Sequence, residues 1–195
     1  MKKIAVGPKA KDCINIEISL TENMKAVAKA LGKDVQDLTI IIQDRERHQD
    51  LIDEVIKAGA TVKLFSDVDI TWALATAFEE IDGDILVGTG GAPEGVIAAA
   101  ALKCLGGDFQ AKLVPDNQAE FNRCLQMGIP NPEAPLTIGD IVKTDDCFFV
   151  ATGITSGPLL KGVKKKENGA TLTQSLVIVG GEMKNYQYVD ATFLK

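Results

Sequence analysis

The sequence predicts an α/β fold in which a mostly parallel sheet carries helices on both faces and a C-terminal β-hairpin follows. Three short apolar runs rich in β-branched residues alternate with segments of helical periodicity, and the connections between them are short. Two further strand-like segments are separated by Gly180-Gly181, as in a hairpin. With 195 residues, 46% of them hydrophobic, the chain is long enough to bury a substantial core.

The first half of the chain contains the regular alternation. The first expected helix, Thr21–Leu31, is capped by Thr21 and stopped by Gly32, a residue that suits a left-handed position. Continuous apolar runs are typical of parallel strands buried on both faces, and they place strands at Leu38–Ile42, Thr61–Phe65 and Asp84–Val87. One helix is expected to carry Leu51, Ile52, Val55 and Ile56 on one face and to end at Gly59. Two further helices are expected over Ile70–Phe78 and Val96–Leu105.

The second half is less regular. We expect a strand at Phe109–Val114, a helix at Asn117–Met127 and a strand at Phe148–Ala151. The final hairpin is expected to pair Leu172–Val179 with Tyr186–Phe193. We find no internal repeat and no low-complexity linker.

Charge and cysteine content argue against several classes of protein. The net charge of −6 argues against nucleic acid or an anionic membrane as the partner, since both select clustered Lys and Arg. The run Lys164–Lys166 is read as a solvated loop in preference to a binding patch. The four cysteines form no Cys-x-x-Cys pair, so we expect reduced thiols and no zinc site. Residues 1–8 lack the apolar core of a signal peptide, which makes the cytoplasm the expected location.

Polar and glycine-rich segments follow all three predicted strands of the first half. Asp44-Arg45-Glu46-Arg47-His48 follows the first strand, Asp67-Val68-Asp69 the second, and Gly88–Gly95 the third. In an open parallel sheet, ligands bind outside the carboxyl ends of the strands, where loops and helix N-termini meet. We therefore expect these three segments to form one site.

The residue types in these segments favour a phosphate-bearing ligand. A glycine loop that opens a helix presents backbone N–H groups to an anion. Arg45 and Arg47 can bind a second phosphate through paired donors. Glu94 can coordinate Mg²⁺ or Mn²⁺, and Asp67 and Asp69 can accept hydrogen bonds from sugar hydroxyls or join the metal shell.

Each of these features also has a purely structural interpretation. The glycine run can be a tight turn, and Glu94 can simply favour the helix dipole. Arg45–Arg47 can be an exposed salt-bridged turn, and His48 a structural histidine. Asp67 and Asp69 can form a turn and a helix cap. Their shared position at one edge of the sheet favours the site.

Two nucleotide-binding motifs are not matched. Gly88–Pro93 does not fit Gly-x-Gly-x-x-Gly because position 93 is proline, and Gly90–Gly95 does not have the glycines in register either. The chain also lacks the Gly-x-x-x-x-Gly-Lys-Ser/Thr loop of ATP-binding proteins.

Several segments resemble class II fructose-1,6-bisphosphatases. They are Leu86–Val96 with the Ala-rich helix after it, Leu105–Asp108, Ile4–Pro8, Asn23–Lys33, Arg47-His48, Phe149–Leu160 and Gly169–Thr171. The resemblance covers essentially the whole chain, and cyanobacterial relatives of that family also use sedoheptulose-1,7-bisphosphate. It implies half of the sugar-phosphatase fold of the inositol monophosphatase-like superfamily.

The resemblance implies a Mn²⁺- or Mg²⁺-dependent phosphatase of gluconeogenesis. In such an enzyme a metal-activated water attacks the 1-phosphate of fructose-1,6-bisphosphate. By motif, Glu94 is a metal ligand and Gly91 contacts the substrate through its backbone. Arg45, Glu46 and Arg47 would form a substrate-binding turn, and Asp67, Val68 and Asp69 would hold the sugar hydroxyls.

Three departures from the family pattern are visible. Val68 stands where the family has glycine, and Glu46 stands where proline is common before Arg47. A β-branched residue at 68 is expected to obstruct a positive φ or a close backbone approach to the sugar. Most metal-binding carboxylates of the family belong to an N-terminal domain, whereas Met1 aligns with the interior of a full-length member.

We therefore expect residues 1–195 to be the C-terminal, substrate-side portion of such an enzyme. An initial strand and helix would occupy 1–35, an α/β core 36–160, and the C-terminal hairpin 161–195. With Glu94 as the single metal ligand and no catalytic residue assigned, the chain alone is expected to be inactive or weakly active. The expected partners are a sugar bisphosphate, further copies of the chain and a separate N-terminal chain. The alternative is a non-catalytic sugar-phosphate-binding or regulatory module, and a degraded gene product ranks last.

Overall fold

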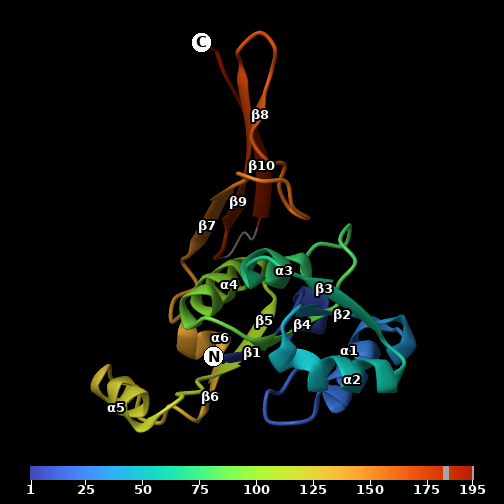
Figure 1. Cartoon of the computed structure of the whole chain (residues 1–195), viewed down its shortest axis with the longest axis vertical. Helices are drawn as coiled ribbons and strands as arrows, with labels where there is room; N and C mark the ends of the chain where they lie inside the picture. Colours follow the sequence, from blue (N-terminus) through green and yellow to red (C-terminus); the bar gives the residue numbers. More distant parts are fainter. Residues whose placement is uncertain (182–184, 195) are drawn as a thin grey trace.

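The computed structural model describes residues 1–181 and 185–194, which form two β-sheets and the helices around them (Figure 1). The larger sheet has the strand order β3-β2-β4-β1-β5-β6, and the smaller has β10-β9-β7 with β8 also paired to β9. The strands are β1 Lys2–Val6, β2 Thr39–Gln43, β3 Thr61–Phe65, β4 Ile85–Thr89, β5 Asp108–Lys112, β6 Pro135–Thr137, β7 Phe148–Thr152, β8 Lys164–Lys165, β9 Thr171–Val179 and β10 Asn185–Phe193. The helices are α1 Leu20–Leu31, α2 Gln49–Ala58, α3 Asp69–Ala75, α4 Ala92–Leu105, α5 Gln118–Gln126 and α6 Ile138–Ile141, with 3₁₀ turns η1 Pro8–Ala10, η2 Val35–Asp37 and η3 Glu46–His48.

Four strands of the larger sheet run in one direction, which confirms the α/β class with a mostly parallel sheet. Strand β2 pairs in parallel with β3 and β4, with Ile42 opposite Leu64 on one side and Val87 on the other. Strand β1 lies antiparallel between β4 and β5, so β5 runs in the direction of β4. The central position of β1 was not predicted. Strand β6 extends the sheet in the opposite direction beyond β5.

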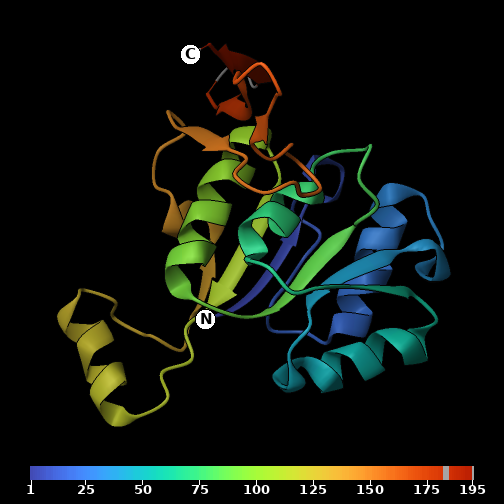
Figure 2. The same ribbon diagram turned by 45° about the horizontal axis from the view of Figure 1, so that its top comes forward.

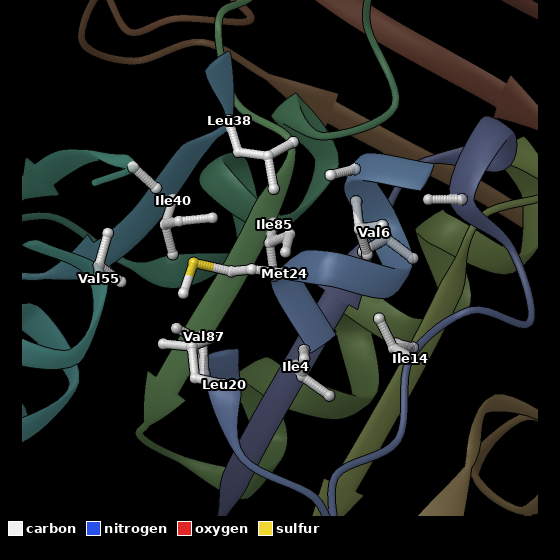
Figure 3. Close-up of a cluster of buried hydrophobic side chains, with 14 of the residues drawn as sticks. Ile4, Val6, Ile14, Leu20, Met24, Leu38, Ile40, Val55, Ile85 and Val87 are labelled. Atoms are coloured by element: carbon white, nitrogen blue, oxygen red, sulfur yellow. The ribbon is translucent and has the colours of Figure 1, made fainter. Parts of the chain in front are cut away.

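Helices cover both faces of this sheet because its central strands are apolar on both sides. On one face, β-branched side chains of β1, β2 and β4 pack on α1 and α2 (Figure 3). In Figure 3 the side chain of Met24 extends from α1 between Ile40, Val55 and Ile85, and all four are fully buried. On the other face, Ala5 of β1 and its neighbours pack on α3 and α4.

The smaller sheet forms a further layer on the outer side of α3 and α4 (Figures 1 and 2). Leu74 of α3 and Cys104 of α4 share a buried cluster with Leu176 and Ile178 of β9. The sequence of α4 is Ala-rich and has little amphipathic character, as expected for a helix that is covered on two sides. Two helix layers and two sheets therefore alternate through the molecule.

Several element boundaries agree with the sequence and others correct it. Strand β3 has the expected limits, and the hairpin of β9 and β10 is confirmed, although residues 182–184 of its connection and residue 195 lie outside the described residues. The expected cap of α1 at Thr21 was wrong: the N-cap is Ser19, which forms a reciprocal capping box with Glu22. Helix α4 begins four residues before Val96, at Ala92, because Pro93 suits the first turn of a helix.

Helix α5 stands apart from both sheets in Figure 1, and none of its residues is buried. The preceding turn explains where it starts, since the Asn117 side chain accepts a hydrogen bond from the N–H of Glu120. The Lys164–Lys166 run is exposed as expected, but Lys164 and Lys165 form the short strand β8. None of the helices in the described part of the chain combines the length and the hydropathy of a membrane-crossing segment.

Candidate functional site

The three segments expected to form one site follow neighbouring strands. Because β3, β2 and β4 are adjacent and parallel, their carboxyl ends lie at the same edge of the sheet. The backbone of Asp44 donates to the carbonyl of Phe65 at 2.8 Å, which joins the ends of β2 and β3. The predicted convergence of the three segments is therefore confirmed.

The basic turn after β2 is exposed and presents both arginine side chains. Arg45 donates to the carbonyls of Asp44, at 2.8 Å, and Ser66, at 3.3 Å. Arg47 donates through Nε to the carbonyl of Thr89 at 3.0 Å and through one terminal nitrogen to Gln43 at 3.2 Å. A guanidinium carries five N–H donors, so each arginine keeps donors for an anion. Neither arginine forms an ion pair with a carboxylate of the described residues.

His48 is a structural histidine, the simpler of its two interpretations. Its side chain is 1% exposed. Nδ1 lies 2.8 Å from the carbonyl of Gln43, to which it donates, and Nε2 accepts from the N–H of Thr89 at 2.8 Å. The imidazole thus joins the end of β2 to the end of β4. Gly88 allows the ring to lie close to β4, since a Cβ there would be only 3.1 Å from it.

The acidic turn after β3 contains one exposed and one half-buried carboxylate. Asp67 is exposed, and its backbone carbonyl accepts from the side chain of Gln43 at 2.9 Å. Val68 is the N-cap of α3 and is 56% exposed. Asp69 begins α3, and its side chain is only 14% exposed. Gln43 therefore contacts both the acidic turn and Arg47, a role that sequence reasoning missed.

Lys3 is the second residue that sequence reasoning missed. It lies in β1, is 2% exposed, and places Nζ 2.5 Å from Oδ2 of Asp69 and 3.0 Å from the carbonyl of Gly91. The ammonium group thus lies beside the N-termini of α3 and α4, where the helix dipoles disfavour a cation. The carboxylate of Asp69 offsets that cost and joins the acidic turn to the glycine loop.

The glycine loop ends at Gly91, the N-cap of α4, which has no side chain to cap the helix. Pro93 has no N–H, so Ala92 and Glu94 supply the amide donors of the first turn. The carboxylate of Glu94 folds back over Gly91, where a Cβ would overlap Oε2 of Glu94. Glu94 forms no ion pair with a described residue. Glycine at 91 therefore allows the carboxylate to sit beside these free amides.

A cleft of about 590 Å³ borders the basic and acidic turns. Arg45, Asp67 and Val68 line one side of it, and residues 152–160 line the other. Trp72 of α3 and Phe149 of β7 contribute apolar surface between these walls. Of the predicted site residues, Arg45, Asp67 and Val68 face this cleft, whereas Arg47, Asp69, Gly91 and Glu94 gather around the glycine loop. Glu46 is exposed and makes no side-chain hydrogen bond with a described residue.

The carboxylates fit a metal ion only in part. Within residues 1–181 and 185–194, no group of three His, Cys, Asp or Glu side chains is arranged to hold one. A hard divalent cation takes about six oxygen ligands. Glu94 can provide one of them, and Asp69 is already paired with Lys3. The described residues therefore do not form a complete metal site by themselves.

Comparison with known proteins assigns the family. Residues 1–193 match the family described as bacterial fructose-1,6-bisphosphatase, glpX-encoded. The chain belongs to this family. The whole chain is 39% identical to a D-fructose 1,6-bisphosphatase class 2/sedoheptulose 1,7-bisphosphatase of Microcystis aeruginosa. It is 38% identical to the proteins of that name from Synechocystis sp. and Crocosphaera subtropica. The chain spans 59% of the length of each of these relatives.

The backbone conformation at position 68 shows whether valine can stand where the class II bisphosphatase pattern has glycine. Val68 has φ −71° and ψ 141°, an extended conformation open to any residue. Position 68 therefore needs no positive φ that a β-branched residue would obstruct, whereas the obstruction of a close backbone approach to the sugar stays a prediction. The valine side chain instead adds apolar surface to the cleft wall.

Proposed function

We propose that these 195 residues form the sugar-phosphate-binding part of a class II fructose-1,6-bisphosphatase. The reaction is hydrolysis of the 1-phosphate of fructose-1,6-bisphosphate, a step of gluconeogenesis in the cytoplasm, by a homo-oligomeric enzyme. The observation that carries the proposal is the meeting of a basic turn, an acidic turn and a glycine loop at one edge of the sheet. Family membership supports the same reaction.

Each turn has a distinct role in the proposal. Arg45 and Arg47 bind a phosphate through the donors that their backbone contacts leave free. Asp67 and the second oxygen of Asp69 accept hydrogen bonds from sugar hydroxyls. The free amides at the start of α4 bind the other phosphate, and the backbone of Gly91 contacts the substrate. Glu46 and Val68 border the bound sugar.

The metal ion requires ligands beyond this chain's own. Mn²⁺ or Mg²⁺ would polarise the phosphate and lower the pKa of a bound water. Glu94 would be one ligand of that ion. Since the chain spans 59% of its relatives' length, we propose that a further segment, in the same polypeptide or a separate one, supplies the remaining carboxylates.

A non-catalytic sugar-phosphate-binding module is the second candidate. It is favoured by one observation: Glu94 is the single carboxylate beside the glycine loop that is free of an ion pair among the described residues. Such a module would bind a bisphosphate without metal and without hydrolysis.

Phosphate release separates the two candidates. The chain would be assayed with fructose-1,6-bisphosphate and Mn²⁺ or Mg²⁺, alone and mixed with the part of the Microcystis relative that it does not match. We expect metal-dependent release in the mixture, abolished by Glu94→Gln and retained in Arg123→Ala, which alters an exposed arginine of α5. Binding without release under any divalent metal would favour the module. Absence of binding would reject both.

A further inference from the structure

Two cysteines far apart in the sequence meet between α4 and the smaller sheet. Cys104 lies in the last turn of α4, and Cys147 directly precedes β7. Their sulfur atoms are 3.0 Å apart, and the residues are separated by 43 positions. Cys104 is fully buried, whereas Cys147 is half-buried. The pair is therefore close enough to react and accessible from one side.

The two sulfurs must come closer to form a bond. A disulfide has an S–S bond of about 2.05 Å, so an approach of about 1 Å is needed. Gly180 lies beside Cys147: a Cβ there would be 3.1 Å from the Cys147 sulfur. The segment before Cys147 is already attached to α4, because Lys103 donates to the carbonyl of Val142 and lies 3.1 Å from a carboxylate oxygen of Asp145.

The other two cysteines provide internal controls. Cys13 follows η1, and its sulfur donates to the carbonyl of Lys11. Cys124 lies in α5, which stands away from the sheets (Figure 1). Neither has a sulfur partner among the described residues.

We propose that Cys104 and Cys147 are a redox pair that forms a reversible disulfide with a small-molecule disulfide as the oxidant. The Cys147 thiolate attacks the oxidant, forms a mixed disulfide and releases one small thiol. The sulfur of Cys104 then attacks the sulfur of Cys147, while its proton passes to the departing sulfur of the oxidant, which leaves as the second small thiol. The pair loses two electrons and two protons, and the oxidant is reduced to two thiols.

The order of attack follows from burial. Burial raises the pKa of the Cys104 thiol to about 12, and its hydrogen bond with Cys147 adds to this effect. The nucleophile in thiol–disulfide exchange is the thiolate. Cys147, which reaches solvent, is therefore the residue that meets the oxidant, and Cys104 resolves the mixed disulfide.

The bond would attach the smaller sheet covalently to α4. Strand β7 continues from Cys147 into residues 152–160, one wall of the cleft, while α4 begins at the glycine loop. A disulfide would thus prevent the smaller sheet from separating from α4. The inference is independent of the proposed reaction, because it concerns thiols outside the candidate site.

Oxidation of the folded chain tests the pair. We expect oxidised glutathione to reduce the number of titratable thiols from four to two without added glutathione mass, and peptide mapping to find Cys104 linked to Cys147. The midpoint of thermal unfolding should rise, and dithiothreitol should reverse both changes. The double variant Cys13→Ser/Cys124→Ser should form the same disulfide as the unchanged chain. Cys147→Ser should form no disulfide and keep its three remaining thiols. Glutathione remaining on Cys147, or pairing only after the chain is unfolded in urea, would overturn the inference.

Discussion

The ammonium nitrogen of Lys3 lies 2.5 Å from the carboxylate of Asp69, although 66 positions separate the two residues in the sequence. Both side chains are largely buried, at 2% and 14% exposure. The same ammonium group donates to the carbonyl of Gly91. One buried ion pair therefore connects β1, the acidic turn and the glycine loop, and it holds the parts of the candidate site in one arrangement.

Replacing Lys3 by methionine should destabilise the protein strongly. Removing one partner of a buried pair leaves the other charge uncompensated, and we expect a loss of about 3 kcal/mol in the free energy of unfolding. Urea unfolding followed by circular dichroism measures it. Lys9→Met is the matched control, because Lys9 and Glu79 form a pair that is 68% and 77% exposed, and its loss should leave the free energy of unfolding nearly unchanged.

The double variant Lys3→Met/Asp69→Leu identifies the cause. If the uncompensated carboxylate destabilises the single variant, removing it should recover much of the lost stability. A double variant no more stable than Lys3→Met would show that packing, and not charge, is responsible.

This ion pair is an example of a feature that could not be predicted from the sequence. A lysine in a short strand looks like a surface residue until its partner is known, and that partner lies 66 positions further along the chain. The antiparallel position of β1 was hidden for the same reason, since five residues do not specify which strand they join. The strand ends of β2, β3 and β4 were predictable because their segments are local and the parallel arrangement follows from alternation. Ser19 and Glu22 carry the capping-box spacing, so the true start of α1 was readable in the sequence.

Gly88→Ala should disturb the contact between β4 and His48. The new Cβ would lie 3.1 Å from the imidazole, and relieving such overpacking costs roughly 1–3 kcal/mol. Gly139→Ala is the control, because its Cβ would meet only Thr137 at 3.7 Å, an ordinary contact. Nitrogen NMR reads out the effect directly, since His48 is the single histidine of the chain. Ring nitrogen signals of His48 identical to those of the unaltered chain would contradict the expected disturbance.

Gly91→Ala should lower metal-dependent activity with little change in the stability of the fold. Its Cβ would displace the flexible carboxylate of Glu94, so the free energy of unfolding should change by less than about 1 kcal/mol. Metal-dependent phosphate release by the reconstituted enzyme should fall as it does in Glu94→Gln. Full activity in Gly91→Ala would show that the folded-back position of Glu94 is not the one that binds metal.

The capping box of α1 should give a pH-dependent contribution to stability. The hydrogen bonds from Ser19 lower the pKa of Glu22, so the charged form is favoured in the folded state. This contribution is present above the ordinary pKa of glutamate and is lost as the pH falls through the lowered value. The stability difference between the unaltered chain and Ser19→Ala should therefore shrink in acid. Ser66→Ala, whose side chain makes no hydrogen bond to a described residue, should show no such trend.

Calorimetric titration with fructose-1,6-bisphosphate, with and without Mn²⁺, tests the central claim most directly. We expect the unaltered chain to bind without metal, and Arg45→Ala and Arg47→Ala to weaken binding roughly ten- to hundredfold through the loss of charge-assisted hydrogen bonds. Arg123→Ala, which removes the remaining arginine, should leave the affinity unchanged. Equal affinity in all three variants, or no binding to the unaltered chain, would contradict the assignment of this edge of the sheet as a sugar-phosphate site.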